Sequence, residues 1–278
     1  MKKIFYLGAE DSYSYIISKQ VILDKNHILI SAKNFSEIVE STIKTKNAIG
    51  VLPIENSITS DIHENIDYLF KTDLKILYEA FLRIKLHLIG FKQATIKDIK
   101  NVYSHERALA QSSIFIKAHQ LTIHEQQSTS ESKEKVLQEQ DKTNGIIGSA
   151  EISNHPQLQT LQTDIGNDPY NMTRFVFVGS TNTELVTGIK NKTSIIFTIP
   201  HMPGALAQLL TVIAQAHLNV TKIESRPIPG TNWEYQFWID IENTNGELLK
   251  EQIEQIFIKN TLSYKNIGIY PKGEIFES

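Results

Sequence analysis

The chain of 278 residues contains no cysteine. Disulfide bonds, a thiolate nucleophile and cysteine-ligated metals are therefore excluded, and nothing in the composition indicates an oxidising compartment. The sequence also lacks a basic excess, because 28 Lys and Arg residues stand against 31 Asp and Glu residues, for a net charge of -3. A protein that binds a phosphate backbone needs such an excess, so nucleic acid is not an expected partner.

Long apolar runs are missing as well. No segment approaches the roughly 18 consecutive apolar residues that a membrane-spanning helix needs, so no membrane partner is expected. Residues 1–7 have the lysines of a signal peptide, but Glu10 and Asp11 end the apolar stretch early. We interpret this stretch as a first strand, the two acidic residues as solvated, and the protein as cytoplasmic.

Several catalytic motifs are absent. The nine histidines show no HExxH or HxH spacing, so no zinc or iron site is predicted. There is no GxSxG elbow of a serine hydrolase and no Gly-rich phosphate loop. Hydroxyl and amide side chains remain, and they favour a polar, metal-free site for an organic acid.

The apolar pattern predicts an α/β protein of more than one lobe, because 278 residues are too many for one small core. Short apolar runs alternate with amphipathic segments over the first 150 residues. The predicted strands are 4–7, 49–53, 74–78, 82–89, 102–105, 121–124 and 145–148, and the predicted helices are 13–24, 108–116 and 128–144.

A polar stretch from Asn182 to Lys192 predicts a domain boundary. Beyond it the order of elements becomes βαββαβ, which is the ferredoxin-like unit. Such a small unit often buries an edge or a face of its sheet against a second copy. The predicted strands are 193–199, 218–223, 233–242 and 267–270, and the predicted helices are 205–216 and 247–258.

Polar side chains stand where predicted strands end, which is where ligands bind in α/β lobes. Asn56 and Ser57 follow one strand, Ser104 and His105 end another, and Gln111 lies in the next helix. A third hydroxyl cluster, 128–130, precedes a helix. Helix capping explains the first and third groups equally well, and His105 has an equally ordinary structural explanation.

Thr173, Arg174 and Phe175 place a hydroxyl, a fixed cation and an aromatic face at the start of a strand. A rigid scaffold holds polar groups against a ligand in such places. Alternatively, the three residues are a turn residue, a surface arginine and a strand residue in chance order.

Taken in order, the motifs resemble those of the prephenate dehydratases of the monofunctional type, which carry a C-terminal ACT regulatory domain. The resemblance covers nearly the whole chain. It rests on Tyr6-Leu7-Gly8 with Ser12-Tyr13-Ser14, Pro53 to Ser57, Tyr103-Ser104-His105 with Gln111, Ser128-Thr129, Asn171 with Thr173-Arg174-Phe175, Gly204-Ala205-Leu206, and Glu224-Ser225-Arg226-Pro227.

The resemblance implies a catalytic region at 1–182, built as two lobes like a type II periplasmic binding protein with the active site between them, and an ACT domain at 193–272. It implies decarboxylation and dehydration of prephenate to phenylpyruvate without a cofactor. Its carried-over residues are Thr173, Asn56, Ser104 and Gln111 for catalysis, and Ser57, Thr129, Arg174 and Phe175 for substrate binding. Arg174 would either pair with a substrate carboxylate or hold the local loop.

For regulation, the resemblance implies L-phenylalanine as effector and a homodimer or homotetramer. The turn Gly204-Ala205-Leu206 would open a helix whose free N–H groups receive an amino-acid carboxylate, aided by Glu224, Ser225, Arg226 and Pro227. Alternatively, these are a helix-start turn and a surface ion pair. No segment resembling a chorismate mutase precedes the motifs, so a fused bifunctional form is not expected.

The sequence departs from the family pattern at Gly8-Ala9-Glu10-Asp11, where Gly-Pro-x-Gly is usual, and at Ser60, where a glycine is usual. Two other functions therefore stand beside the first. One is a prephenate decarboxylase that keeps the ring hydroxyl, against which Thr173 argues. The other is a non-catalytic amino-acid sensor in which only the ACT-like domain binds a ligand.

Overall fold

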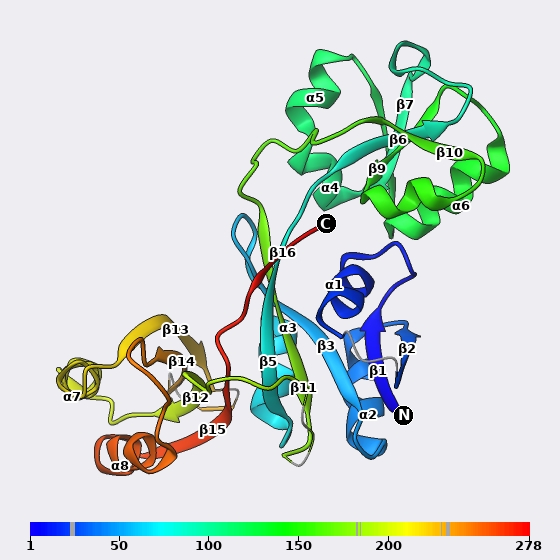
Figure 1. The fold of residues 1–278 in the computed structure, drawn as a ribbon. Coiled ribbons are helices and arrows are strands. Elements are labelled where there is room, and N and C mark those ends of the chain that lie inside the picture. The colour runs from blue at the N-terminus through cyan, green and yellow to red at the C-terminus, as the bar shows by residue number, and fades with distance from the viewer. Residues whose placement is uncertain (23–25, 182, 184, 229, 232–233) are drawn as a thin grey trace.

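The computed structural model describes residues 1–22, 26–181, 183, 185–228, 230–231 and 234–278. They form three parts, each with its own sheet: lobe 1, lobe 2 and a C-terminal domain (Figure 1). In Figure 1 lobe 2 lies above lobe 1, and the C-terminal domain lies beside lobe 1 on the side away from β1 and β2. None of the helices in these ranges is long and apolar enough to cross a bilayer.

Lobe 1 is a mixed sheet with the strand order β16-β5-β11-β3-β1-β2, and β4 pairs with β3. Parallel β1, β2 and β3 are joined to antiparallel β11, which in turn pairs with β5. Its strands are β1 (Lys2–Leu7), β2 (His27–Ala32), β3 (Ile49–Asn56), β4 (Ser60–Asp61), β5 (Lys75–Arg83), β11 (Met172–Gly179) and β16 (Ile275–Glu277), and its helices are α1 (Tyr13–Val21), α2 (Phe35–Lys44) and α3 (His63–Lys71).

Lobe 2 has the strand order β10-β6-β9-β7-β8. Parallel β7, β8 and β9 carry the helices, while β6 and β10 form an antiparallel edge. Its elements are β6 (His87–Phe91), η1 (Ile96–Asp98), β7 (Asn101–His105), α4 (Glu106–Gln111), α5 (Ser113–Ala118), β8 (Thr122–Gln126), α6 (Thr129–Glu139), β9 (Asn144–Gly148), η2 (Ala150–Asn154) and β10 (Leu158–Gln162).

The C-terminal domain confirms the predicted βαββαβ order in an antiparallel sheet with the strand order β13-β14-β12-β15. The predicted strand start at Trp233 and the boundary residue Asn182 lie outside the described residues, as do residues 23–24 of the first predicted helix. The elements are β12 (Lys192–Thr198), α7 (Ala205–Gln215), β13 (Asn219–Pro227), β14 (Tyr235–Glu242), α8 (Lys250–Asn260) and β15 (Ser263–Tyr270).

Several predicted element boundaries are wrong: the helix predicted at 128–144, for example, ends at Glu139. Two of the differences have a clear physical cause. Segments 74–78 and 82–89 were expected as two strands, but β5 runs without a break through Glu79. Glu79 interrupts the apolar pattern, yet its carboxylate is fully buried because Arg174 and Lys192 pair with it. The predicted helix 108–116 is two short helices, α4 and α5, because the backbone of buried Ser112 leaves the helical region (φ -118°, ψ 16°).

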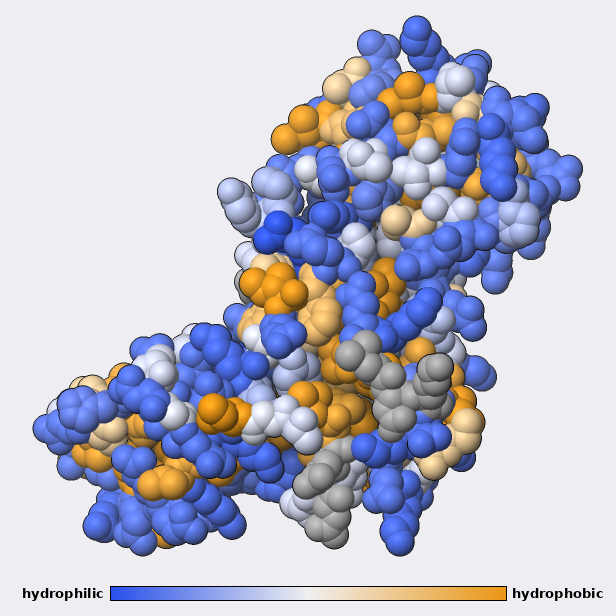
Figure 2. Space-filling view, viewed as in Figure 1, coloured by the Kyte–Doolittle hydropathy of each residue, from blue (hydrophilic) through white to orange (hydrophobic). Residues whose placement is uncertain are grey.

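The C-terminal domain rests directly on lobe 1. Helices α7 and α8 cover one face of its sheet, and the other face joins the lobe 1 core through Ile196, Trp238, Ile267 and Tyr270. The approach is close, since a Cβ on Gly268 would lie 2.3 Å from the carbonyl oxygen of Ile76. Figure 2 shows that hydrophilic residues cover most of the face in view, with apolar residues in small groups. The C-terminal domain and lobe 1 therefore share one hydrophobic core.

Candidate active site

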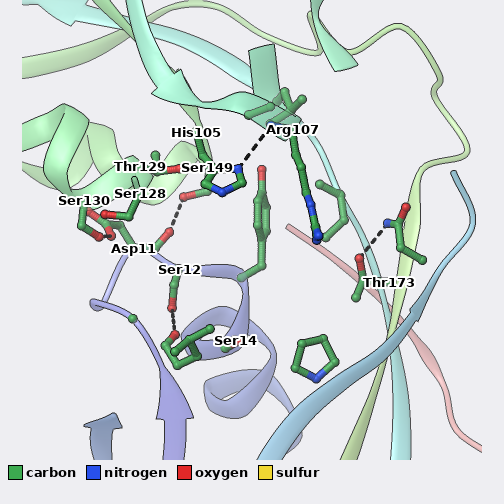
Figure 3. A pocket seen from close by; sticks show the side chains of 18 of the residues that line it. Asp11, Ser12, Ser14, His105, Arg107, Ser128, Thr129, Ser130, Ser149 and Thr173 are labelled. Atoms are coloured by element: carbon green, nitrogen blue, oxygen red, sulfur yellow. Dashed lines mark hydrogen bonds between the residues drawn. The ribbon is translucent and has the colours of Figure 1, made fainter. Parts of the chain in front are cut away.

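A cavity of about 410 Å³ lies between the two lobes. Lobe 1 lines it with the carboxyl ends of β1 and β3 and with the starts of α1 and β11. Lobe 2 lines it with the β7–α4 junction and the start of α6 (Figure 3). The chain crosses between the lobes at 84–86 and at 163–171, and the first crossing lines this space through Ile84 and Leu86. This is the arrangement expected for a two-lobed binding-protein-like region, and it confirms the predicted fold class.

Thr173 is held at the lobe 1 side of the cavity. Side chains alternate along β11, so Thr173 and Phe175 face the cavity and Arg174 faces away. The amide of Asn56 donates a hydrogen bond to Thr173 Oγ1 at 2.9 Å. Because the threonine oxygen accepts this bond, its own proton is free to point at a bound molecule.

A chain of amides supports this pair. Asn56 Nδ2 also donates to Asn171 Oδ1 at 2.8 Å, and Asn171 Nδ2 donates to Gln111 Oε1 at 3.1 Å. Asn56 Oδ1 accepts hydrogen bonds from the backbone of Ile58 and Thr59, both at 3.0 Å. The turn thus fixes the amide orientation of Asn56. The alternative prediction, that Asn56 or Ser57 caps the following helix, is wrong, because the N-cap position of α3 is Ile62 and no side chain caps it.

Two helices begin at the cavity. Ser12 caps α1 by accepting a hydrogen bond from Tyr15 N at 3.2 Å, and Ser128 caps α6 by accepting one from Glu131 N at 3.1 Å. Thr129 and Ser130 line the cavity beside Ser128. The free backbone N–H groups of two helix ends make this side of the cavity suited to carboxylates. The hydroxyl cluster 128–130 therefore lies at the start of α6, which Ser128 caps, and also lines the cavity.

The prediction that Glu10 and Asp11 are both solvated is wrong for Asp11, which is buried. Glu10 is exposed. The Asp11 carboxylate forms an ion pair with Lys133 and accepts a hydrogen bond from Ser130 Oγ at 3.2 Å. Its backbone oxygen accepts another from Ser149 Oγ at 2.7 Å. All these partners belong to lobe 2, so Asp11 ties the lobes together, and a charged group is buried because it is paired.

Three candidate residues lie outside the cavity lining. Ser57 clamps the backbone next to the site, with its hydroxyl donating to Tyr170 O and accepting from Met172 N at 3.0 Å. Ser104 is fully buried and donates to Ile147 O at 2.6 Å. Both side chains link neighbouring strands. The third candidate residue outside the cavity lining is Arg174.

Arg174 points to the C-terminal domain. Its guanidinium pairs with Asp240 at 2.5 Å and with Glu79 at 2.7 Å, and all three side chains are buried. Burial alone would lower the pKa of Arg174, but the charges of Asp240 and Glu79 outweigh it and hold that pKa above its usual range. Of the two roles predicted for Arg174, its contacts support the structural one.

Asp240 is the centre of this buried polar group. It accepts hydrogen bonds from Ser194 Oγ at 2.5 Å and from Trp238 Nε1 at 2.7 Å. Burial would raise the pKa of Asp240, but the charge of Arg174 lowers it overall. The strand that carries Thr173 is thus joined to the sheet of the C-terminal domain through the residue next to Thr173 in sequence.

The predicted regulatory residues separate into two groups. Gly204, Ala205 and Leu206 line a second cavity, of about 580 Å³, at the start of α7. Glu224, Ser225, Arg226 and Pro227 do not line it and lie on β13. Instead, Glu224 Oε1 lies 3.1 Å from His63 Nδ1, and Arg226 Nη2 lies 3.0 Å from Asp67 Oδ1, both on α3 of lobe 1.

Comparison with known proteins identifies the family. The family profile of prephenate dehydratase matches residues 4–183, and that of the ACT domain matches residues 193–257. The chain belongs to the prephenate dehydratase family. It is accordingly an enzyme of the lyase class, acting on prephenate.

Named relatives agree with this result. A prephenate dehydratase of Methanocaldococcus jannaschii is 33% identical over 275 residues, which are 97% of this chain and 98% of the relative. The crystal structure of the dehydratase from Staphylococcus aureus superposes with a TM-score of 0.84 at 25% identity, covering 97% of this chain and 100% of that one. A prephenate dehydratase from Arthrobacter aurescens in complex with L-Phe gives a TM-score of 0.81 at 23% identity, covering 98% and 90%.

Sequence reasoning gave no role to two further cavity residues, Arg107 and Asp11. Arg107 stands two residues after His105, so the rule that ligands bind at strand ends would have found it. Asp11 gave no such signal, because its partner Lys133 is 122 residues away in sequence.

Proposed function

We propose that the reaction takes place in the inter-lobe cavity, with Thr173 donating a hydrogen bond to the hydroxyl that leaves the substrate ring. The observation that carries this proposal is the hydrogen bond from Asn56 to Thr173 Oγ1, which leaves the threonine proton free for a molecule bound in the cavity. A threonine hydroxyl is a weak acid, so it polarises the leaving oxygen and relays a proton.

The reaction breaks two bonds. The carbon–carbon bond to the ring carboxylate breaks, carbon dioxide leaves, and the electron pair enters the ring. The carbon–oxygen bond on the opposite ring carbon breaks, and the departing hydroxide takes up a proton to become water. Prephenate dianion and one proton thus give phenylpyruvate anion, carbon dioxide and water, and the new aromatic ring supplies the driving force.

The protein then has to orient the ring and assist hydroxide departure. The amide chain of Asn56, Asn171 and Gln111 fixes the position of Thr173. Thr129 at the start of α6 and the aromatic face of Phe175 complete the binding surface. Ser57 and Ser104 hold the strands behind it.

The test is phenylpyruvate formation from prephenate by the wild type and by Thr173→Ala. We expect kcat to fall by about 10²- to 10⁴-fold in Thr173→Ala, the range of one lost proton donor, and Thr173→Ser to retain most of the activity. The control is Thr211→Ala, an exposed threonine of α7 far from the cavity. Undiminished turnover in Thr173→Ala would remove Thr173 from the mechanism.

The same assay separates the alternative functions. A product that keeps the ring hydroxyl would indicate a decarboxylase. Absence of turnover by folded wild type that still binds L-phenylalanine would indicate an amino-acid sensor.

We propose that L-phenylalanine is the effector and binds in the cavity at the start of α7. The backbone N–H groups of Leu206 and Ala207, just after Gly204 and Ala205 at the start of α7, would receive its carboxylate. The apolar side chains of Leu206 and Phe237 would contact its ring. The Arthrobacter aurescens relative in complex with L-Phe supports this choice. Addition of L-phenylalanine to the assay is expected to inhibit turnover, which requires unequal binding to two states of the enzyme.

The domain organisation and assembly belong to the same proposal. We assign residues 1–182 to the catalytic region and 193–272 to the ACT domain. A homodimer or homotetramer is supported by β13, a nine-residue strand at the edge of its sheet that suits pairing with a second copy. Light scattering tests the assembly, and cell fractionation tests the proposed cytoplasmic location.

A further inference from the structure

Among the described residues, Arg107 is the only lysine or arginine that lines the inter-lobe cavity. The acid in this lining, Asp11, is neutralised by Lys133. The cavity therefore presents one uncompensated positive charge to a substrate with two carboxylates. Arg174, which the sequence offered as a carboxylate partner, is committed to Asp240 and Glu79.

The guanidinium of Arg107 has no partner within the described part of the chain. Only the backbone N–H of Arg107 is bonded, to His105 Nδ1 at 3.2 Å. The other arginines are all paired: Arg83 with Glu277, Arg174 with Asp240, and Arg226 with Asp67. A long cationic side chain without a partner, directed into a cavity, is ready to bind an anion bidentately.

The position of Arg107 suits a substrate contact. It also lines a smaller cavity of about 270 Å³ together with Thr59, Gln111 and Asn171, the residues that surround the Asn56–Thr173 pair. Figure 3 shows its side chain running from the lobe 2 ribbon into the space between the lobes, on the same side as Thr173.

We propose that Arg107 binds the carboxylate of the substrate that the product retains. The proposal rests on the proposed function of the cavity. A guanidinium on the departing carboxylate would stabilise the charge that must leave it, and would hold back the reaction. On the retained side-chain carboxylate, the charge is the same in the ground state and in the transition state, so the contact binds without opposing the chemistry.

The test is steady-state kinetics of Arg107→Gln and Arg107→Lys with prephenate, with phenylpyruvate as a competitive inhibitor. Arg107→Gln is expected to raise KM by roughly 10- to 100-fold, the loss of one charged hydrogen-bonding pair, with kcat within about threefold of wild type. The inhibition constant of phenylpyruvate should rise by a similar factor, because phenylpyruvate has the retained carboxylate. Arg107→Lys should recover part of the affinity.

The control is Arg83→Gln, which removes an arginine from an ion pair outside the cavity and should leave KM unchanged. An unchanged KM in Arg107→Gln, with an active wild type, would overturn the proposal while leaving the proposed function intact. A raised KM with unchanged phenylpyruvate inhibition would overturn the assignment to the retained carboxylate. An inactive wild type would instead contradict the proposed function itself.

Discussion

At the scale of single residues, the direction of one hydrogen bond determines how Thr173 acts. Asn56 is a donor to Thr173 Oγ1, and the backbone of Ile58 and Thr59 fixes which end of its amide faces the threonine. The Asn56 amide thereby makes Thr173 an acceptor toward residue 56 and leaves its proton for the substrate.

Substitution Asn56→Asp should reverse this bond. A carboxylate only accepts, so Thr173 would donate its proton to residue 56 and turn its lone pairs to the substrate. We expect kcat to fall about 100-fold, the low end of the range for a lost proton donor. KM should rise as well, because the new carboxylate lines a cavity that binds a dianion. Steady-state kinetics of the variant, with exposed Asn154→Asp as control, checks this. A kcat equal to wild type would mean that the bond does not orient Thr173.

Arg174 shows what sequence reasoning does well and where it stops. The alternation of side chains along a strand already implies that Thr173 and Arg174 face opposite sides, so both cannot touch one ligand. The partners of Arg174 could not be predicted from the sequence. Asp240 is far away in sequence and belongs to the C-terminal domain. Glu79 lies in β5, at the point where the apolar pattern predicted a break between two strands.

At the scale of elements, β13 meets lobe 1 through charged side chains. Glu224 contacts His63 and lies between Lys222 and Asp61, while Arg226 pairs with Asp67. Burial, together with the hydrogen bond and charge of Asp61, raises the pKa of Glu224 to about 7. The folded protein therefore holds this proton more tightly than the unfolded chain does.

The pH dependence of stability follows from that direction. Below the ordinary pKa of 4.5 the contribution of Glu224 is fully present, and it is lost as the pH rises through about 7. Between pH 5 and 8, the free energy of unfolding of wild type should fall. We expect the free energy of unfolding of Glu224→Gln to fall less over the same range. Urea unfolding across this range, with exposed Glu251→Gln as control, measures the difference. Parallel curves for wild type and Glu224→Gln would contradict it.

Some helices and strands were easier to predict from the sequence than others. The βαββαβ order of the C-terminal domain was predicted because each of its strands and helices has clear periodicity. The elements that were not predicted are β2, β4, α2, α3, η1, η2, β10 and β16. Strand β2 is only partly buried and β10 has polar residues, so neither shows a strong apolar pattern.

At the scale of the whole molecule, the cavity depends on how the two lobes are held. Asp11 of lobe 1 binds Lys133, Ser130 and Ser149 of lobe 2, and buries a charge at the mouth of the site. These contacts join the start of α1 in lobe 1 to α6 and the residue after β9 in lobe 2.

Substitution Lys133→Met should loosen this tie without changing the cavity lining, since Lys133 does not line it. Asp11 would keep its buried position without a counter-charge, at a cost of about 1–3 kcal/mol. We expect lower stability and a larger radius of gyration by X-ray scattering, because the lobes are held together less tightly. KM should rise both for this reason and because the unpaired Asp11 carboxylate lines the cavity that binds a dianion.

Lys135→Met is the matched control, because Lys135 lies on the same helix in an exposed pair with Glu139 at 3.3 Å. Such a pair contributes about 0–1 kcal/mol. If the two variants have the same KM and the same radius of gyration, the Asp11 contacts do not set the closure of the lobes.

The return of β16 to lobe 1 has a consequence for domain exchange. After the ACT domain, residues 275–277 pair in parallel with β5, and Glu277 reaches Arg83 and Lys85 beside the crossing between the lobes. The regulatory unit is therefore inserted into the catalytic fold, with a junction on either side. A chimaera that transplants a foreign effector domain must be spliced at both junctions, because a single cut would remove an edge strand from the catalytic sheet.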